Sequence, residues 1–210
     1  MRAYTVEDAE KVLGVVDAGL VSGLGVAEPG KMCVEAAICY ALGLPHGDDP
    51  GCVEPAVRAF KIALNDKRWS SKTARAKGLR GLAVAQLGSK GVIDGREFVR
   101  RLAEQTIRQI VPIALRAAAQ RSPRFAERLE ASAIRCEQEG TRDAALNAKA
   151  AAAAAAAAYA DAAAAAYAAA AYAAAAAADW VLTKIADIAL QILRDMGAPG
   201  VALWDAVHTS

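Results

Sequence analysis

A basic segment from Lys61 to Arg80 carries the side chains best suited to binding chemistry. It contains seven lysine and arginine residues and a single acid, Asp66. Trp69 lies in the middle of it and is followed by two serines, where the sequence predicts the start of a helix. Guanidinium groups, an aromatic ring, hydroxyl groups and helix N–H donors together suit a small ligand that carries both phosphate and a base.

A solvated basic surface beside acidic helices is the alternative interpretation of this segment. Its cations fall on several faces of the predicted helices, which favours that alternative. Polymeric nucleic acid is not expected as a partner, because the formal net charge of the whole chain is only +2. The basic segment therefore predicts a small anionic ligand rather than a polymer.

The binding hypothesis gives each candidate side chain a role. Four cations of the basic segment would hold phosphate, and Trp69 would stack on a base. Asp161, a lone carboxylate in an apolar stretch, would contact polar groups of the ligand together with Tyr159, unless it pairs with an arginine such as Arg108 or Arg116. The predicted ligand-binding set is Lys31, Arg68, Trp69, Ser71, Lys72, Arg75, Arg80, Tyr159 and Asp161.

The segment from Gly25 to Lys31 fits the first seven positions of a phosphate-binding loop. In such a loop glycines let backbone N–H groups face phosphate, the lysine adds charge, and a following Ser or Thr binds magnesium. Here Met32 replaces that hydroxyl, and Pro29 removes one N–H donor. We therefore do not expect nucleotide hydrolysis, although Lys31 at a helix N-terminus would still attract an anion.

Metal binding and cysteine catalysis are not favoured by the spacing of the candidate residues. Three cysteines and one histidine between residues 33 and 52 are separated by five, six and five residues, whereas zinc sites usually use closer pairs. A cysteine nucleophile needs a histidine base, and His46 and His208 stand in no catalytic motif. We expect buried thiols, no metal, no cofactor and no enzymatic activity.

The stretch Ala150–Ala178, here called the alanine tract, organises the predicted fold. Alanine occupies 25 of its 29 positions, so we expect one continuous helix of about 44 Å. Its lack of a charged face predicts contact with protein around most of the helix. Either the other helices of the chain wrap it, or a second copy of the chain buries it. A membrane span is disfavoured, because alanine is barely apolar and Asp161 lies inside the tract.

Helical patterns recur along the rest of the chain, and no strand-like alternation exceeds four residues. Gly78 and Gly81 predict close packing by a neighbouring helix, and Pro112 predicts a kink. The fold class is therefore all-α, a multi-helix bundle around the long alanine-rich helix. The expected helices cover about residues 6–17, 31–42, 53–64, 71–87, 94–115, 123–138 and 180–196, with a glycine-rich loop at 19–30.

We expect two sequence regions packed as one domain. Residues 1–140 form a helical region with the glycine-rich loop and the basic segment. Residues 141–210 contribute the long alanine-rich helix and a C-terminal amphipathic helix. Because of the charged residues near the N-terminus we expect no secretory signal. Four cysteines without one suggest reduced thiols, so a cytoplasmic protein is expected.

The alanine tract, interrupted by Tyr and Asp, resembles the alanine-rich tracts of helical proteins from bacterial and bacteriophage genomes, some of them named immunity proteins. The resemblance covers about residues 144–178. The segments 32–37, 39–44 and 69–71 also have the look of phage-borne proteins. The resemblance implies an all-helical accessory protein and supplies no functional residues.

Two hypotheses of function follow from the sequence. The first is a non-enzymatic binding protein, in a phage-borne setting a counter-defence protein that sequesters a small anionic, nucleotide-like signal. The alternative is a homo-oligomeric structural or protein-interaction module assembled through close-packed alanine helices. The expected partners are thus a small anionic ligand and a second copy of the chain, without polymeric nucleic acid or a membrane.

Overall fold

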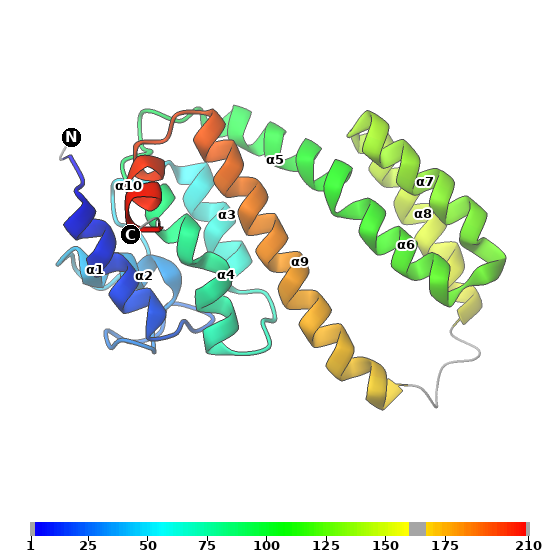
Figure 1. The fold of residues 1–210 in the computed structure, drawn as a ribbon, viewed down its shortest axis with the longest axis horizontal. Coiled ribbons are helices and arrows are strands. Elements are labelled where there is room, and N and C mark those ends of the chain that lie inside the picture. Colours follow the sequence, from blue (N-terminus) through cyan, green and yellow to red (C-terminus); the bar gives the residue numbers. More distant parts are fainter. Residues whose placement is uncertain (1–2, 160–166, 209–210) are drawn as a thin grey trace. The chain divides into compact units, whose positions relative to one another are not determined.

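The computed structural model describes residues 3–159 and 167–208, with the backbone alone at 155–159 and 167–177. This described part of the chain is all-α, as predicted, and its one β-type pairing is an isolated bridge between Gly25 and Met32. The α-helices are α1 (Val6–Asp17), α2 (Val34–Ala41), α3 (Pro55–Asn65), α4 (Lys72–Ala85), α5 (Gly95–Gln109), α6 (Val111–Arg121), α7 (Ala126–Glu139), α8 (Arg142–Tyr159), α9 (Tyr167–Asp195) and α10 (Pro199–His208) (Figure 1).

The chain divides into two compact units. Unit 1 contains Met1–Val99 and Ala175–Ser210, and unit 2 contains Arg100–Ala174. Unit 2 is therefore an insertion in the sequence of unit 1, and the boundaries between them fall within α5 and α9. The region boundary expected at residue 140 lies inside unit 2, between α7 and α8, which pack against each other.

Side-chain caps set where the first helices of unit 1 begin. Thr5 and Asp8 form a reciprocal capping box, so α1 starts at Val6 as predicted. α2 begins at Val34, three residues later than predicted, because the Cys33 thiol caps it by accepting from the N–H of Ala36 at 3.4 Å. Lys31 therefore precedes this helix rather than standing at its N-terminus.

Helix α4 lies at the centre of unit 1, where α1, α2, α3 and α10 all pack against it. Gly200 of α10 meets the end of α4 so closely that a Cβ atom would lie 2.4 Å from the carbonyl oxygen of Val84. Only glycine permits this approach. The sequence pattern predicts that the last helix ends near Gly197 and does not indicate α10, which Pro199 begins.

Helix α9 runs through Asp179 and Trp180 without interruption. Asp179 binds the loop before α4, since one carboxylate oxygen accepts from the backbone N–H of Ser70 at 2.8 Å and the other from its hydroxyl. Within the alanine tract, the backbone is helical up to Tyr159 and again from Tyr167. The predicted continuity of one helix between these points lies outside the described residues.

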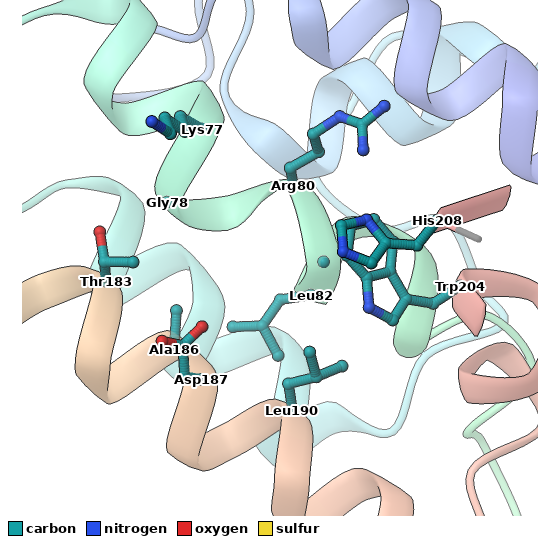
Figure 2. Close-up of a pocket in the computed structure, with 11 residues that line it drawn as sticks. Lys77, Gly78, Arg80, Leu82, Thr183, Ala186, Asp187, Leu190, Trp204 and His208 are labelled. Atoms are coloured by element: carbon teal, nitrogen blue, oxygen red, sulfur yellow. The ribbon is translucent and has the colours of Figure 1, made fainter. Parts of the chain in front are cut away.

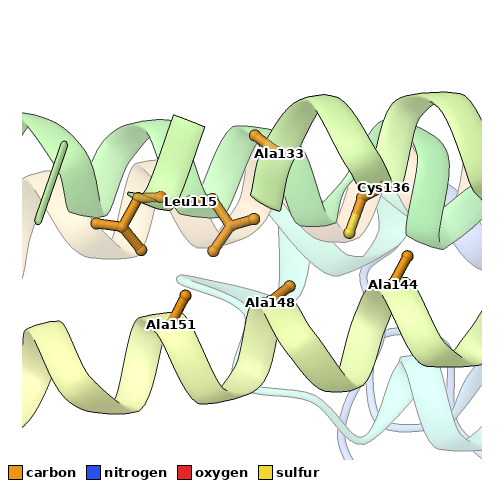
Figure 3. Close-up of a cluster of buried hydrophobic side chains, with 7 residues drawn as sticks. Leu115, Ala133, Cys136, Ala144, Ala148 and Ala151 are labelled. Carbon is orange, nitrogen blue, oxygen red and sulfur yellow. The ribbon is translucent and has the colours of Figure 1, made fainter. Parts of the chain in front are cut away.

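Unit 2 packs α6, α7 and α8 side by side. Its buried cluster is built from small apolar side chains, and Ala144, Ala148 and Ala151 share one face of α8 (Figure 3). The helix predicted over residues 94–115 is interrupted at Ile110, because Pro112 cannot donate the next helical hydrogen bond. The cluster consists of Leu115, Leu129, Ala133, Cys136, Ala144, Ala148 and Ala151.

The end of α7 and the start of α8 are both capped. Gly140 adopts the left-handed conformation with φ of 63° and ends α7, close to the predicted helix end at about residue 138. The Arg108 guanidinium donates to the last carbonyls of α7, at 2.7 Å to Glu137 O and 3.0 Å to Glu139 O. Thr141 then caps α8 by accepting from the N–H of Ala144 at 3.2 Å. These bonds satisfy backbone groups that would otherwise lack partners.

Candidate functional site

The loop from Gly25 to Lys31 folds back on itself instead of opening toward a ligand. The N–H of Val26 donates to Lys31 O at 2.9 Å, and the N–H of Lys31 donates to Glu28 O at 2.9 Å. The Lys31 ammonium pairs with the Glu28 carboxylate at 2.9 Å. These N–H groups and the Lys31 ammonium are therefore engaged within the loop rather than pointing toward a phosphate.

Trp69 and Arg75, two predicted ligand contacts, are built into the interior of unit 1. Trp69 is only 6% exposed, and its indole N–H donates to Leu64 O at 3.0 Å. Arg75 is 9% exposed and donates to Asn65 O at 2.8 Å and Leu20 O at 2.9 Å. Burial lowers the pKa of Arg75. Both side chains hold neighbouring loops and helix ends to α4.

The other candidates near the start of α4 have separate surroundings. Of the two serines at the predicted helix start, Ser71 caps α4 by accepting from the N–H of Ala74 at 3.0 Å. The Lys72 ammonium donates to Gly30 O at 3.3 Å and so ties the glycine-rich loop to α4. Arg68 is exposed. The side chains of Tyr159 and Asp161 lie outside the described residues.

Arg80 is the predicted contact that lines a pocket in the described part of unit 1. This pocket has a volume of about 420 Å³ and lies between α4, α9 and α10 (Figure 2). We call it the α4–α9–α10 pocket. Its lining residues are Lys77, Gly78, Arg80, Gly81, Leu82, Thr183, Ala186, Asp187, Leu190, Trp204 and His208.

Two glycines of α4 set the spacing of the helices around this pocket. A Cβ atom at Gly78 would lie 2.4 Å from the Trp69 ring and 3.0 Å from the Thr183 hydroxyl. A Cβ atom at Gly81 would lie 3.2 Å from Leu190 and 3.4 Å from Trp204. The close packing predicted for these glycines is confirmed, and α9 and α10 can approach the backbone of α4 because side chains are missing there.

The walls of the pocket differ in chemistry. Figure 2 shows Thr183 and Asp187 projecting from α9 on one side, and Trp204 with His208 on the other. The Trp204 and His208 rings are stacked, with centroids 4.5 Å apart and an interplanar angle of 21°. The Arg80 guanidinium carbon lies 5.6 Å from the centre of the Trp204 ring. The pocket thus combines an aromatic wall, a cation and hydrogen-bonding groups around an apolar floor.

The Arg80 side chain is oriented by a second contact. Its Nε donates to both carboxylate oxygens of Asp17, at 2.9 and 3.2 Å. This pair fixes the guanidinium between α1 and the Trp204 ring. A cation held in place loses less conformational entropy when it binds an anion than a freely rotating one.

The sequence pattern does not predict most of the residues that line this pocket. The predicted ligand-binding set does not include Thr183, Asp187, Trp204 or His208. The sequence pattern does not indicate α10, and it predicts only an amphipathic helix over residues 180–196. One signal was available: Pro199 suits the first turn of a helix, and the four-residue spacing of Trp204 and His208 then places both rings on one face.

A separate polar cluster is fully buried where α2, α3 and the end of α4 meet. Glu35, Lys61 and Gln86 have no exposed surface. The Lys61 ammonium lies 3.3 Å from Glu35 Oε1, and the Gln86 amide donates to Glu35 Oε2 at 3.1 Å. Burial raises the pKa of Glu35 and lowers that of Lys61, while their mutual attraction opposes both shifts. Lys61 of the basic segment is therefore an interior residue.

The four cysteines are buried free thiols. Burial raises the pKa of Cys39 to about 11, so its thiol stays protonated at neutral pH and is a poor nucleophile. Burial also raises the pKa of Cys33 and of Cys136. Within the described residues, no three His, Cys, Asp or Glu side chains converge as a metal site requires.

Comparison of the chain with protein-family models, with curated proteins and with solved structures gives no match. In the part of the chain that the structure describes, no helix combines the length and the apolar character needed to cross a bilayer.

Proposed function

We propose that the α4–α9–α10 pocket binds a small anionic, nucleotide-like ligand, and that the protein acts by holding this ligand rather than by converting it. The observation that carries the proposal is the placement of the Arg80 cation beside the Trp204 ring in one pocket. The volume of this pocket, about 420 Å³, lies within the range typical of small-molecule sites.

Each part of a nucleotide has a suitable counterpart in this pocket. Arg80 and the exposed Lys77 supply positive charge for phosphate at the α4 side. Trp204 supplies an aromatic surface for a base. Thr183 and Asp187 on α9 supply hydrogen-bonding groups for the polar edge of the ligand.

This proposal keeps the ligand class expected from the sequence and changes the residues that contact it. Trp204 takes the stacking role first given to Trp69, whose ring is buried. Arg80 keeps its phosphate role, whereas Arg75 is bonded to backbone carbonyls inside unit 1. A counter-defence role would require the bound nucleotide to be a signalling molecule, and it stays a prediction.

The test is isothermal titration of the full chain with AMP, comparing wild type with Arg80→Ala. A hydrogen bond to a charged group contributes about 1.5–3 kcal/mol, so we expect a loss of about ten- to a hundredfold in affinity. Arg68→Ala is the matched control, because Arg68 belongs to the same basic segment but does not line the pocket.

Circular dichroism must show unchanged helicity in both variants, because Arg80 also pairs with Asp17. Equal AMP affinity of Arg80→Ala and wild type would contradict the phosphate role of Arg80. Failure of the wild-type protein to bind AMP or other nucleotides would contradict the proposed function itself.

A further inference from the structure

The ring of His208 is stacked on the ring of Trp204. The two ring centroids are 4.5 Å apart, and the planes are inclined by only 21°. Both residues line the α4–α9–α10 pocket, and the His208 side chain is exposed whereas Trp204 is half-buried (Figure 2). A flat ring parallel to an indole at this distance has the geometry of a stacked aromatic pair.

Trp204 has a fixed position, independently of His208. The indole lies against α4, where a Cβ atom at Gly81 would be 3.4 Å from it, and the Arg80 guanidinium lies over its ring. Helix α10 is further held by the Arg194 guanidinium, which donates to both oxygens of Asp205 at 2.5 and 2.7 Å. Removal of His208 therefore leaves the aromatic wall in place.

We propose that His208 occupies the stacking place of the ligand, and that a ligand with a flat heteroaromatic ring displaces it from Trp204. This inference rests on the proposed function and adds the chemical class of the ligand, a nucleotide whose base stacks on Trp204. It also adds a regulatory contact, because the protein's own imidazole competes with the base. A ligand with phosphate but no aromatic ring would not compete with His208.

The competition makes a directional prediction for affinity. The stacked pair of His208 and Trp204 stabilises the ligand-free protein, and a ligand must break this pair in order to bind. Losing the pair should therefore raise ligand affinity by about two- to tenfold. His208→Ala should therefore bind AMP more tightly than wild type by this factor. His208→Phe keeps a ring on Trp204 and should bind AMP no more tightly than wild type.

The experiment measures the affinities of the full-length wild type and both variants for AMP and for ribose 5-phosphate, which has no base. We expect His208→Ala to change the affinity for AMP alone. His46→Ala is the matched control, because His46 contacts Gly25 O in a different part of unit 1. In wild type, the imidazole NMR signals of His208 should shift when AMP is added but not when ribose 5-phosphate is added.

The outcomes separate the inference from the proposed function. AMP binding that His208→Ala leaves unchanged or weakens would overturn the inference while the proposed function stands. Equal affinities for AMP and ribose 5-phosphate, with no shift of the His208 signals, would overturn the inference and the stacking role proposed for Trp204, while phosphate binding by the pocket would stand. Absence of AMP binding by wild type and by His208→Ala would overturn both.

Discussion

The two units of this protein have interiors of different chemistry. Unit 1 buries Glu35, Lys61 and Gln86 completely and Arg75 almost completely. The buried cluster of unit 2 contains alanine, leucine and one cysteine. Charged groups of unit 2 form ion pairs at its surface instead. Arg116, for example, pairs with two glutamates.

The two kinds of interior differ in how strictly their side chains determine a single arrangement of the helices. A buried ammonium or carboxylate is satisfied in one arrangement, and a small displacement leaves it without partners at a cost of several kcal/mol. Alanine faces are nearly alike from one turn to the next, so close approach rather than polar matching holds α8 in unit 2. We therefore expect polar contacts to constrain the helix positions of unit 1, which contains the pocket, more than those of unit 2.

Removing the cation of the buried cluster should give the largest effect. Lys61→Met leaves Glu35 buried without its partner and should lower the free energy of unfolding by about 3–5 kcal/mol. Urea denaturation followed by tryptophan fluorescence measures this in unit 1, because Trp69, Trp180 and Trp204 all lie there.

Two further variants show whether burial of the charged pair causes this loss of stability. Lys11→Met removes an exposed lysine that pairs with Glu7 at 2.7 Å, and should cost less than about 1 kcal/mol. Adding Glu35→Gln to Lys61→Met removes the unpaired charge and should recover part of the loss. If Lys61→Met costs no more than Lys11→Met, the buried pair does not specify unit 1.

Enlarging an alanine in unit 2 should give an intermediate effect. Ala148 is 1% exposed within the cluster on α8, so Ala148→Leu should overpack it and cost about 1–3 kcal/mol. Ala153→Leu is the matched control, because Ala153 is exposed on the same helix. Hydrogen exchange of α6, α7 and α8 measures the loss, since residues 100–174 contain no tryptophan.

Faster exchange in Ala148→Leu but not in Ala153→Leu would show that close packing holds unit 2. Equal protection in both variants would mean that the alanine face tolerates larger side chains, and that α6, α7 and α8 are held by their caps and surface ion pairs. Tryptophan fluorescence should report unchanged stability of unit 1 in either case.

The helix boundaries that could be predicted from the sequence are those set by local contacts. Thr5, Ser71, Gly140 and Thr141 act on backbone groups within a few residues, so helix ends near these positions can be predicted from local residue types. α10 was missed because Gly197 and Pro199 were interpreted as an end, although proline also begins helices.

The candidate site depends on contacts between distant segments, which the sequence pattern does not contain. Arg75 and Arg80 are five residues apart on α4 and look alike in the sequence, yet one binds interior carbonyls and the other lines the pocket. Their difference arises from what packs on each face of α4. Trp69 and Trp204 differ for the same reason: one is buried against Gly78, and the other forms a pocket wall.

The smallest expected effect tests a polar contact at the surface of unit 1. Asp66 Oδ1 accepts from Gly23 N–H at 2.7 Å, from the Asn65 amide at 2.9 Å and from the Ser22 hydroxyl at 3.2 Å. Although burial opposes the shift, these bonds hold the pKa of Asp66 below its ordinary 3.8. Their stabilisation is therefore fully present above about pH 4 and is lost as the pH falls below it.

Asp66→Asn should lower the melting temperature by about 1–3 °C at pH 6, and this difference from wild type should shrink toward pH 3. A constant difference across that range would show that the carboxylate charge does not stabilise the loop. Polar matching in unit 1 would then be confined to its interior.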